Sequence, residues 1–135
     1  MHAGKVGLVV LGLFLFVPLY AQAFQFQDVV EKAKSKASAA YEPVPGIPDF
    51  MAGLSYDEYQ SIRFDPSKSL WREGNSRFQV MLIPAGKFYT RPVSIHVVDS
   101  EGVHPLSFDK SLFNVDDEAL RKRVPADLGY AGLKL

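Results

Sequence analysis

Apolar and polar positions divide the chain into a helical first part and a strand-rich second part. Over residues 28–41, apolar side chains recur at helical spacing and lysines fill the other faces. The apolar face consists largely of alanine, so we expect this helix to lie on the outside of a larger body. Residues 42–48 contain three prolines, which predict an extended connector because proline disrupts helix interiors and central strands.

Two short helices are predicted from their end signals. Ser55 and Glu58 have the spacing of a capping box, in which each side chain bonds the free backbone N–H of the other residue. A short helix that ends at Gln60 or Ile62 should follow. Residues 116–123 begin with acidic side chains and end with basic ones, the distribution that the helix dipole favours.

From Arg63 onward the hydrophobic period shortens toward two, as in strands. Residues 78–83 and 93–98 are the two strongest candidates, because β-branched and aromatic residues are bounded there by turn formers. A turn is predicted at residues 84–87, between the two candidates. We therefore expect these two strands to form an antiparallel pair.

The remaining strands are shorter. A turn at residues 99–102 leads to residues 103–106, where Pro105 predicts an edge strand. Residues 130–135 alternate again, and the chain stops within this pattern. We therefore expect an incomplete domain, truncated at its C-terminus, whose last strand lacks its partners. The whole pattern predicts a mostly β fold with short helical lead-in segments.

The first 23 residues have the composition of an export signal. Lys5 precedes an apolar run over residues 6–17, which is too short to cross the hydrocarbon core as an anchored helix. Ala21 and Ala23 then supply the small residues of a signal peptidase site, so the mature chain should begin at Phe24. No Arg-Arg pair precedes the run and no Cys follows it. We expect Sec-type export to the periplasm without a stable membrane anchor; an uncleaved anchor is the alternative.

Charge and cysteine content exclude several classes of protein. The chain has 15 Lys and Arg against 15 Asp and Glu, and cleavage removes one positive charge, that of Lys5. Nucleic acids and anionic membranes require a clustered positive surface, so we expect neither partner. The chain has no Cys, which excludes disulfides and thiol chemistry. Residues 24–135 are enough for one hydrophobic core.

Histidines and carboxylates are the candidates for metal binding and catalysis. His96 and His104, with Asp99 between them, have ligand chemistry but not the spacing of a closed zinc site. We interpret His96 as the outward residue of a strand and expect no metal and no cofactor.

Paired carboxylates for acid–base work on a sugar occur at Asp57 and Glu58 and within residues 116–118. Both groups are already explained as helix starts, so we expect no catalytic residue in this chain.

Aromatic residues are dense between Tyr56 and Tyr130. Flat rings can pack against the apolar faces of pyranose sugars, and Trp and Tyr add a hydrogen-bonding edge. Core packing explains most of these rings equally well. We favour structural packing for Trp71 and Tyr89 as well, and because they lie near predicted strand ends they are the candidates for sugar contact as the alternative.

Five segments carry a resemblance to a known family. They are FQDVVEKA at residues 26–33, IPDF at 47–50, LSYDEYQSIRFDP at 54–66 followed by Trp71, PVSIHVV at 92–98 and DLGYAGLKL at 127–135. In this order and spacing, the chain from Phe24 onward resembles the start of the osmoregulated periplasmic glucan biosynthesis proteins G and D (OpgG and OpgD, also called MdoG and MdoD). The missing Arg-Arg pair slightly favours protein G.

The resemblance implies a fold and a substrate. Members are several times longer, with a large galactose-mutarotase-like β-sandwich followed by a smaller immunoglobulin-like domain, so residues 24–135 would be the N-terminal portion of the sandwich. It also implies a periplasmic protein that binds the β-1,2-linked backbone of osmoregulated glucans and works with the glucan synthase machinery of the inner membrane.

Members cleave such glucans as inverting hydrolases. Their acidic residues would lie beyond Leu135, so none is carried onto this chain and the segment itself should be inactive. The alternative is a small self-contained exported β-module that binds a protein or sugar partner without catalysis.

Overall fold

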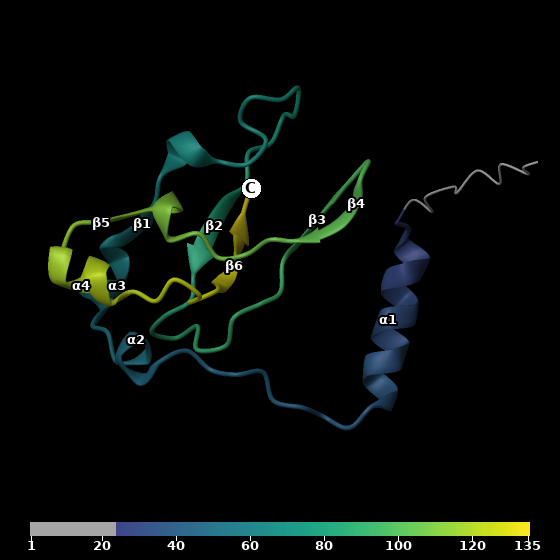
Figure 1. Ribbon diagram of the computed structural model, residues 1–135, viewed down its shortest axis with the longest axis horizontal. Helices are drawn as coiled ribbons and strands as arrows, with labels where there is room; N and C mark the ends of the chain where they lie inside the picture. Colours follow the sequence, from purple (N-terminus) through teal and green to yellow (C-terminus); the bar gives the residue numbers. More distant parts are fainter. Residues whose placement is uncertain (1–23) are drawn as a thin grey trace, which may run out of the picture.

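The computed structural model describes residues 24–135, and the predicted export signal, residues 1–23, lies outside them. Short helices and strands form one body, from which a β-hairpin projects, while the first helix stands beside the hairpin on an extended connector (Figure 1). No helix within residues 24–135 is both long and apolar enough to cross a membrane.

The first helix, α1, spans Phe26–Ser38, against the prediction of residues 28–41. It starts earlier because the Asp28 carboxylate accepts a hydrogen bond of 2.7 Å from the Gln25 N–H at the helix start. It also ends earlier, at Ser38, and the backbone of the next residue, Ala39, is extended. None of its residues is buried, in agreement with the expected outside position, and the following residues 40–48 form the predicted connector.

Two short helices follow the connector. Helix α2 spans Asp49–Ala52 and was not predicted. Helix α3 spans Tyr56–Gln60, and its capping box is confirmed: the Ser55 hydroxyl accepts from the Glu58 N–H at 3.2 Å, and the Glu58 carboxylate accepts from the Ser55 N–H at 2.7 Å.

The predicted pairing of residues 78–83 with 93–98 is wrong. Strand β2, Met81–Pro84, instead pairs antiparallel with β6, Tyr130–Lys134. After β2 the chain turns and reaches Pro92, which has no N–H to donate to a ladder. The expectation that the last strand lacks a partner is therefore wrong too, because β2 supplies one.

Two further antiparallel pairs complete the strands. Strand β3, His96–Asp99, pairs with β4, Gly102–Pro105, across the predicted turn. Strand β1, Ile62–Phe64, pairs with β5, Phe113–Val115. The three sheets are each two-stranded and antiparallel, so the described part agrees with a mostly β fragment that carries short helices.

Aspartates begin the remaining helical turns. Helix α4 spans Glu118–Arg123, and the Asp117 carboxylate at its start accepts from the N–H groups of Ala119 and Leu120. Two 3-10 turns, η1 at Pro66–Lys68 and η2 at Lys110–Leu112, follow Asp65 and Asp109 in the same way. Carboxylates are stabilised at these ends because backbone N–H groups point toward them.

One hydrophobic core joins the helices and strands of the body. Its buried members come from α2, α3, α4, β1, β2, β5 and β6, and from the turns next to them: Met51, Leu54, Tyr59, Ile62, Leu82, Ala85, Phe113, Leu120, Val124, Leu128 and Tyr130. The Tyr130 hydroxyl donates to the Ser107 carbonyl at 3.1 Å and accepts from the Asp109 N–H at 3.0 Å. Such partners are needed because a buried unpaired hydroxyl is costly.

Gly129 sets the entry to β6. Its φ is +84°, and an added Cβ would lie 2.6 Å from the Cβ of Pro92. Only glycine meets both demands without strain. The close approach brings Val93 beside Tyr130, where the Val93 N–H donates to the Tyr130 carbonyl at 2.9 Å. The route between β2 and β3 is therefore tied to the start of β6.

Candidate functional site

Trp71 stands at the start of an exposed loop, residues 71–79, between η1 and β2. The residue is 55% exposed, so it is not part of the core. Its φ is +63°, in the left-handed region that a bulky residue rarely adopts and that costs about 1–3 kcal/mol. The surrounding structure must therefore hold this backbone in place.

The base of this loop is closed by hydrogen bonds. Leu70 and Val80 exchange two backbone bonds of 3.0 Å, and the Arg72 guanidinium donates to the Pro66 carbonyl at 3.2 Å. All residues from 71 to 79 are exposed, and Phe78 is 61% exposed. Figure 1 shows the loop rising from the body between η1 and β2. The predicted strand therefore begins later than residue 78.

Tyr89 lies at the other end of β2. It closes a tight turn with Gly86, through backbone hydrogen bonds of 3.0 and 2.8 Å. Its ring is 53% exposed and lies 6.4 Å, centroid to centroid, from the ring of Tyr59. Since the Trp71 loop precedes β2 and this turn follows it, the two predicted sugar-contact residues lie at opposite ends of one strand.

The histidine candidates lie on the projecting hairpin. His104 Nε2 is 3.3 Å from Asp99 Oδ1, and the same oxygen accepts from the Glu101 N–H at 2.8 Å. His96 is exposed, as expected for an outward strand residue. Within residues 24–135, His, Cys, Asp and Glu side chains form no group of three or more that could hold a metal ion.

The carboxylate candidates have structural contacts. Hydrogen bonds from the Ser55 backbone and hydroxyl lower the pKa of Glu58 from its ordinary value of 4.5. Asp116 forms an ion pair of 2.6 Å with Arg63, which links the β1–β5 pair to the start of α4. Asp57 is exposed in the first turn of α3. The carboxylates begin two separate helices, α3 and α4, and the charge of Asp117 acts against the lowering of the Glu58 pKa.

Asp65 and Asp109 were missed by the sequence reasoning. Each accepts a hydrogen bond from the backbone N–H of a serine two residues on, at 2.9 and 2.8 Å respectively. Hydrogen bonds from Ser67 and Ser111 lower the pKa of the two carboxyls from 3.8. The bond from the serine side chain has the larger effect, and the bond from its backbone N–H has the smaller one. The shared Asp-x-Ser spacing was the signal, and it indicates a structural role.

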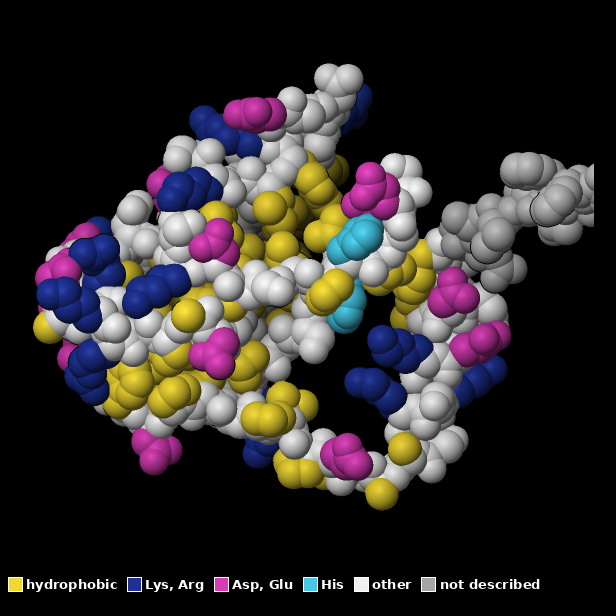
Figure 2. Space-filling model, viewed as in Figure 1, with side chains coloured by type: hydrophobic (Ala, Val, Ile, Leu, Met, Phe, Trp, Pro, Cys, Tyr) yellow, Lys and Arg dark blue, Asp and Glu magenta, His cyan; other side chains and the backbone are white. Residues whose placement is uncertain are grey.

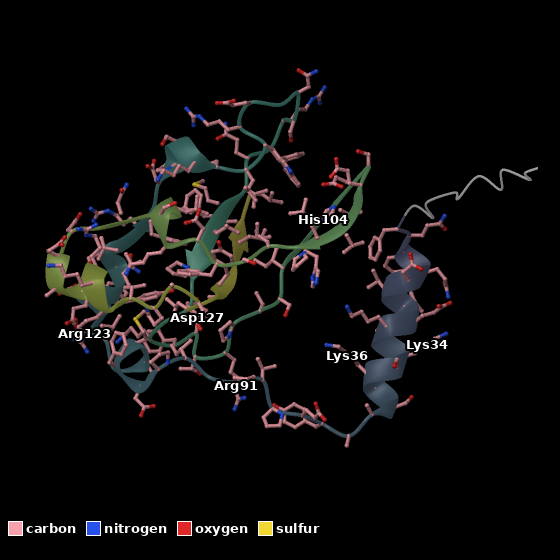
Figure 3. The ribbon with its side chains drawn as sticks, viewed as in Figure 1. Lys34, Lys36, Arg91, His104, Arg123 and Asp127 are labelled. Atoms are coloured by element: carbon pink, nitrogen blue, oxygen red, sulfur yellow. The ribbon has the colours of Figure 1, made fainter. Side chains whose placement is uncertain are left out.

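A groove separates α1 from the β3–β4 hairpin. It encloses about 620 Å³, and its apolar lining includes Val29, Ala33, Val98 and Val103. Lys side chains of α1 face this space in Figure 2, and Figure 3 shows Lys36 directed toward the body. Asp28 also lines the groove, so its charges are mixed and give no strong field for an anionic ligand.

Residues 24–135 match the family described as "Periplasmic glucan biosynthesis protein, MdoG". Similar relatives include glucans biosynthesis protein D 2 of Ralstonia nicotianae, 30% identical over 115 residues, and protein G of Bradyrhizobium diazoefficiens, 35% identical over 116 residues. These alignments cover 84% and 85% of this chain but only 21% and 23% of the relatives. A protein D of Xylella fastidiosa is 32% identical over 85% of this chain and 22% of its own length.

The relatives bear on the predicted resemblance in two ways. The chain spans about a fifth of the length of the curated relatives it matches. Since proteins named D and proteins named G match to similar extents, the slight preference for protein G is not resolved. The match over residues 24–135 does confirm the family itself: this chain belongs to the periplasmic glucan biosynthesis protein family, MdoG.

Proposed function

We propose that this chain is part of a periplasmic protein that binds the β-1,2-linked backbone of osmoregulated glucans during their biosynthesis or processing. The observation that carries the proposal is the family match over residues 24–135. The names of the relatives support a role in glucan synthesis, and the resemblance supplies the linkage. Export by a Sec-type signal would deliver the protein to the compartment in which the family is described.

We further propose that residues 24–135 are the N-terminal portion of a galactose-mutarotase-like β-sandwich. Two facts support this. The relatives are several times longer than the matched region, and among the described residues fifteen large apolar side chains are more than 40% exposed. Where such side chains gather into one patch, further polypeptide or a partner commonly covers them. The glucan synthase machinery of the inner membrane remains our proposed partner.

The chemistry that we assign to this segment is binding without catalysis. Trp71 and Tyr89 are half-exposed rings suited to pyranose faces. Carboxylates such as Glu58, Asp116 and Asp117 are engaged in helix starts and an ion pair. We therefore place any hydrolytic acid and base of the protein, and most of its glucan cleft, outside this segment.

Isothermal titration calorimetry tests the proposed function. The exported protein is titrated with β-1,2-glucan oligosaccharides, and α-1,4-glucan oligosaccharides of equal length serve as the control ligand. We expect saturable heat with the β-1,2-linked ligand and much weaker heat with the control. Equal affinity for both linkages would contradict recognition of the β-1,2 backbone, and absence of heat would contradict glucan binding.

One observation favours the alternative, a self-contained exported β-module without catalysis. Strand β6 finds its partner, β2, within the chain, and one core joins both to the helices. Thermal unfolding of residues 24–135 distinguishes the two proposals. A cooperative transition with a well-dispersed amide spectrum would favour the module, while a broad transition would favour the portion of a larger sandwich.

A further inference from the structure

The loop of residues 71–79 presents two aromatic rings from one narrow base. Trp71 and Phe78 are 55% and 61% exposed. Leu70 and Val80, which exchange both backbone hydrogen bonds, are placed about 5.5 Å apart at Cα, as in any antiparallel pair of this kind. Trp71 directly follows one member of this pair and Phe78 shortly precedes the other. Both residues therefore lie close to the base of the loop.

The backbone of Trp71 has an unfavourable conformation, and burial of its side chain does not offset the cost. Its φ of +63° is rarely tolerated by a bulky residue, and its indole gains little from burial because it is half exposed. The loop is fixed by the Leu70–Val80 pair and by the bond from Arg72 to the Pro66 carbonyl. Strained residues that persist although they do not pack in the core are found mostly at functional sites.

The polar groups of the loop suit a neutral ligand that is rich in hydroxyls. Arg72 and Arg77 supply donors, Glu73 supplies acceptors, and Asn75 supplies both. The loop carries two arginines and one glutamate, a net charge of +1, and Arg72 is engaged with the Pro66 carbonyl. A pyranose offers apolar C–H faces to aromatic rings and hydroxyls to such polar groups.

We infer that residues 71–79 form a carbohydrate-binding loop, in which Trp71 and Phe78 stack on pyranose units of a glucan. This inference rests on the proposed function and deepens it, because it assigns glucan contact to a particular loop and adds Phe78 as a second ring. A protein surface is the competing occupant of this loop, and it predicts glucan binding that does not involve Trp71 or Phe78.

Fluorescence of Trp71 tests the loop directly, because Trp71 is the only tryptophan of this chain. The exported protein is titrated with β-1,2-glucan oligosaccharides, and the signal of the Trp71→Phe variant is subtracted. Trp71→Ala and Phe78→Ala are compared by calorimetry. Tyr56→Ala is the matched control, because Tyr56 is 61% exposed, like Phe78, but lies on α3.

The expected result is a change in Trp71 emission that saturates with the calorimetric heat. Each alanine variant should bind about three- to tenfold more weakly, the loss of one stacked ring, while Tyr56→Ala binds as wild type. If Trp71→Ala does not fold, the emission of the wild type still reports whether glucan reaches Trp71. Trp71→Phe keeps a ring and should retain most of the affinity.

Two other results would overturn the inference. Calorimetric binding with unchanged Trp71 emission and unchanged affinity of the alanine variants would place the glucan elsewhere, while leaving the proposed function intact. Absence of binding by both methods would reject the proposed function and the loop together.

Discussion

The hydroxyl of Tyr59 donates a hydrogen bond of 2.8 Å to the carbonyl oxygen of Pro84, which joins α3 to the end of β2. Both residues are buried, and burial raises the pKa of the Tyr59 hydroxyl above 10.0. Gly86 permits this contact, because an added Cβ there would lie 2.8 Å from the Tyr59 ring. The turn that carries Tyr89 is thus positioned by the core.

Tyr59→Phe should lower the free energy of unfolding by about 1–3 kcal/mol, because the buried Pro84 carbonyl loses its partner. Chemical denaturation of the two proteins measures the difference. Tyr56→Phe is the control, since Tyr56 is 61% exposed and should change stability by no more than about 0.5 kcal/mol. Equal effects of both substitutions would mean that the Tyr59 bond contributes nothing specific.

Acidification should destabilise the protein through Asp65 and Asp109. Both carboxyls have a folded-state pKa below the ordinary 3.8, so their contribution is present above pH 3.8 and is lost as the pH falls through the folded values. In Asp65→Asn/Asp109→Asn, the amide oxygen still accepts the serine N–H but does not titrate. As the pH is lowered from 4, the Tm of this variant should fall less than the Tm of the wild type. An identical fall in both proteins would show that these two groups do not control acid stability.

The carboxylates that begin α3 and α4 should be dispensable for any glucan cleavage. Asp57→Asn and Asp117→Asn should retain turnover within about tenfold of wild type, because losing a general acid or base costs about 10²–10⁴-fold. Asparagine also preserves the Asp117 cap. Turnover on β-1,2-glucan is measured with circular dichroism as the check of folding. A folded variant that has lost a hundredfold or more would show that this segment does carry a catalytic group.

Export should remove residues 1–23 and leave Phe24 as the new N-terminus. The motive is the small-residue site at Ala21 and Ala23, which follows a short apolar run. Mass spectrometry of the periplasmic fraction checks the cleavage. An intact Met1 recovered with the membrane fraction would overturn both the cleavage and the location.

The end signals of α3 and α4 were reliable, and the predicted pairing of strands was not. The Ser55–Glu58 capping box and the acidic start of α4 predicted both helices, because those interactions lie within one helical turn. The partner of β2 could not be read from the sequence. Residues 93–98 and 130–135 alternate equally well, and only the close packing of Gly129 on Pro92 and the core position of Tyr130 favour the distant strand.

The sequence named Trp71 and Tyr89 as candidates for sugar contact but favoured packing for both, and their exposure is a finding of the structure. The pattern of residues 78–83 placed Phe78 inside a predicted strand. Phe78 is exposed because the Leu70–Val80 pair closes the loop two residues after it. That contact joins residues ten positions apart, so a local pattern does not show it. The left-handed backbone of Trp71 has no signal in the sequence at all, because most such positions hold glycine or asparagine.

We propose that this protein takes part in periplasmic glucan biosynthesis, and the glucan content of the periplasm is the direct readout of that role. The gene is deleted in frame, and periplasmic glucan is extracted and quantified from the deletion strain, the wild type and the strain complemented with the gene on a plasmid. We expect glucan to be lost or strongly reduced in the deletion strain and restored by the plasmid. Wild-type glucan of unchanged length and amount in the deletion strain would contradict the claim.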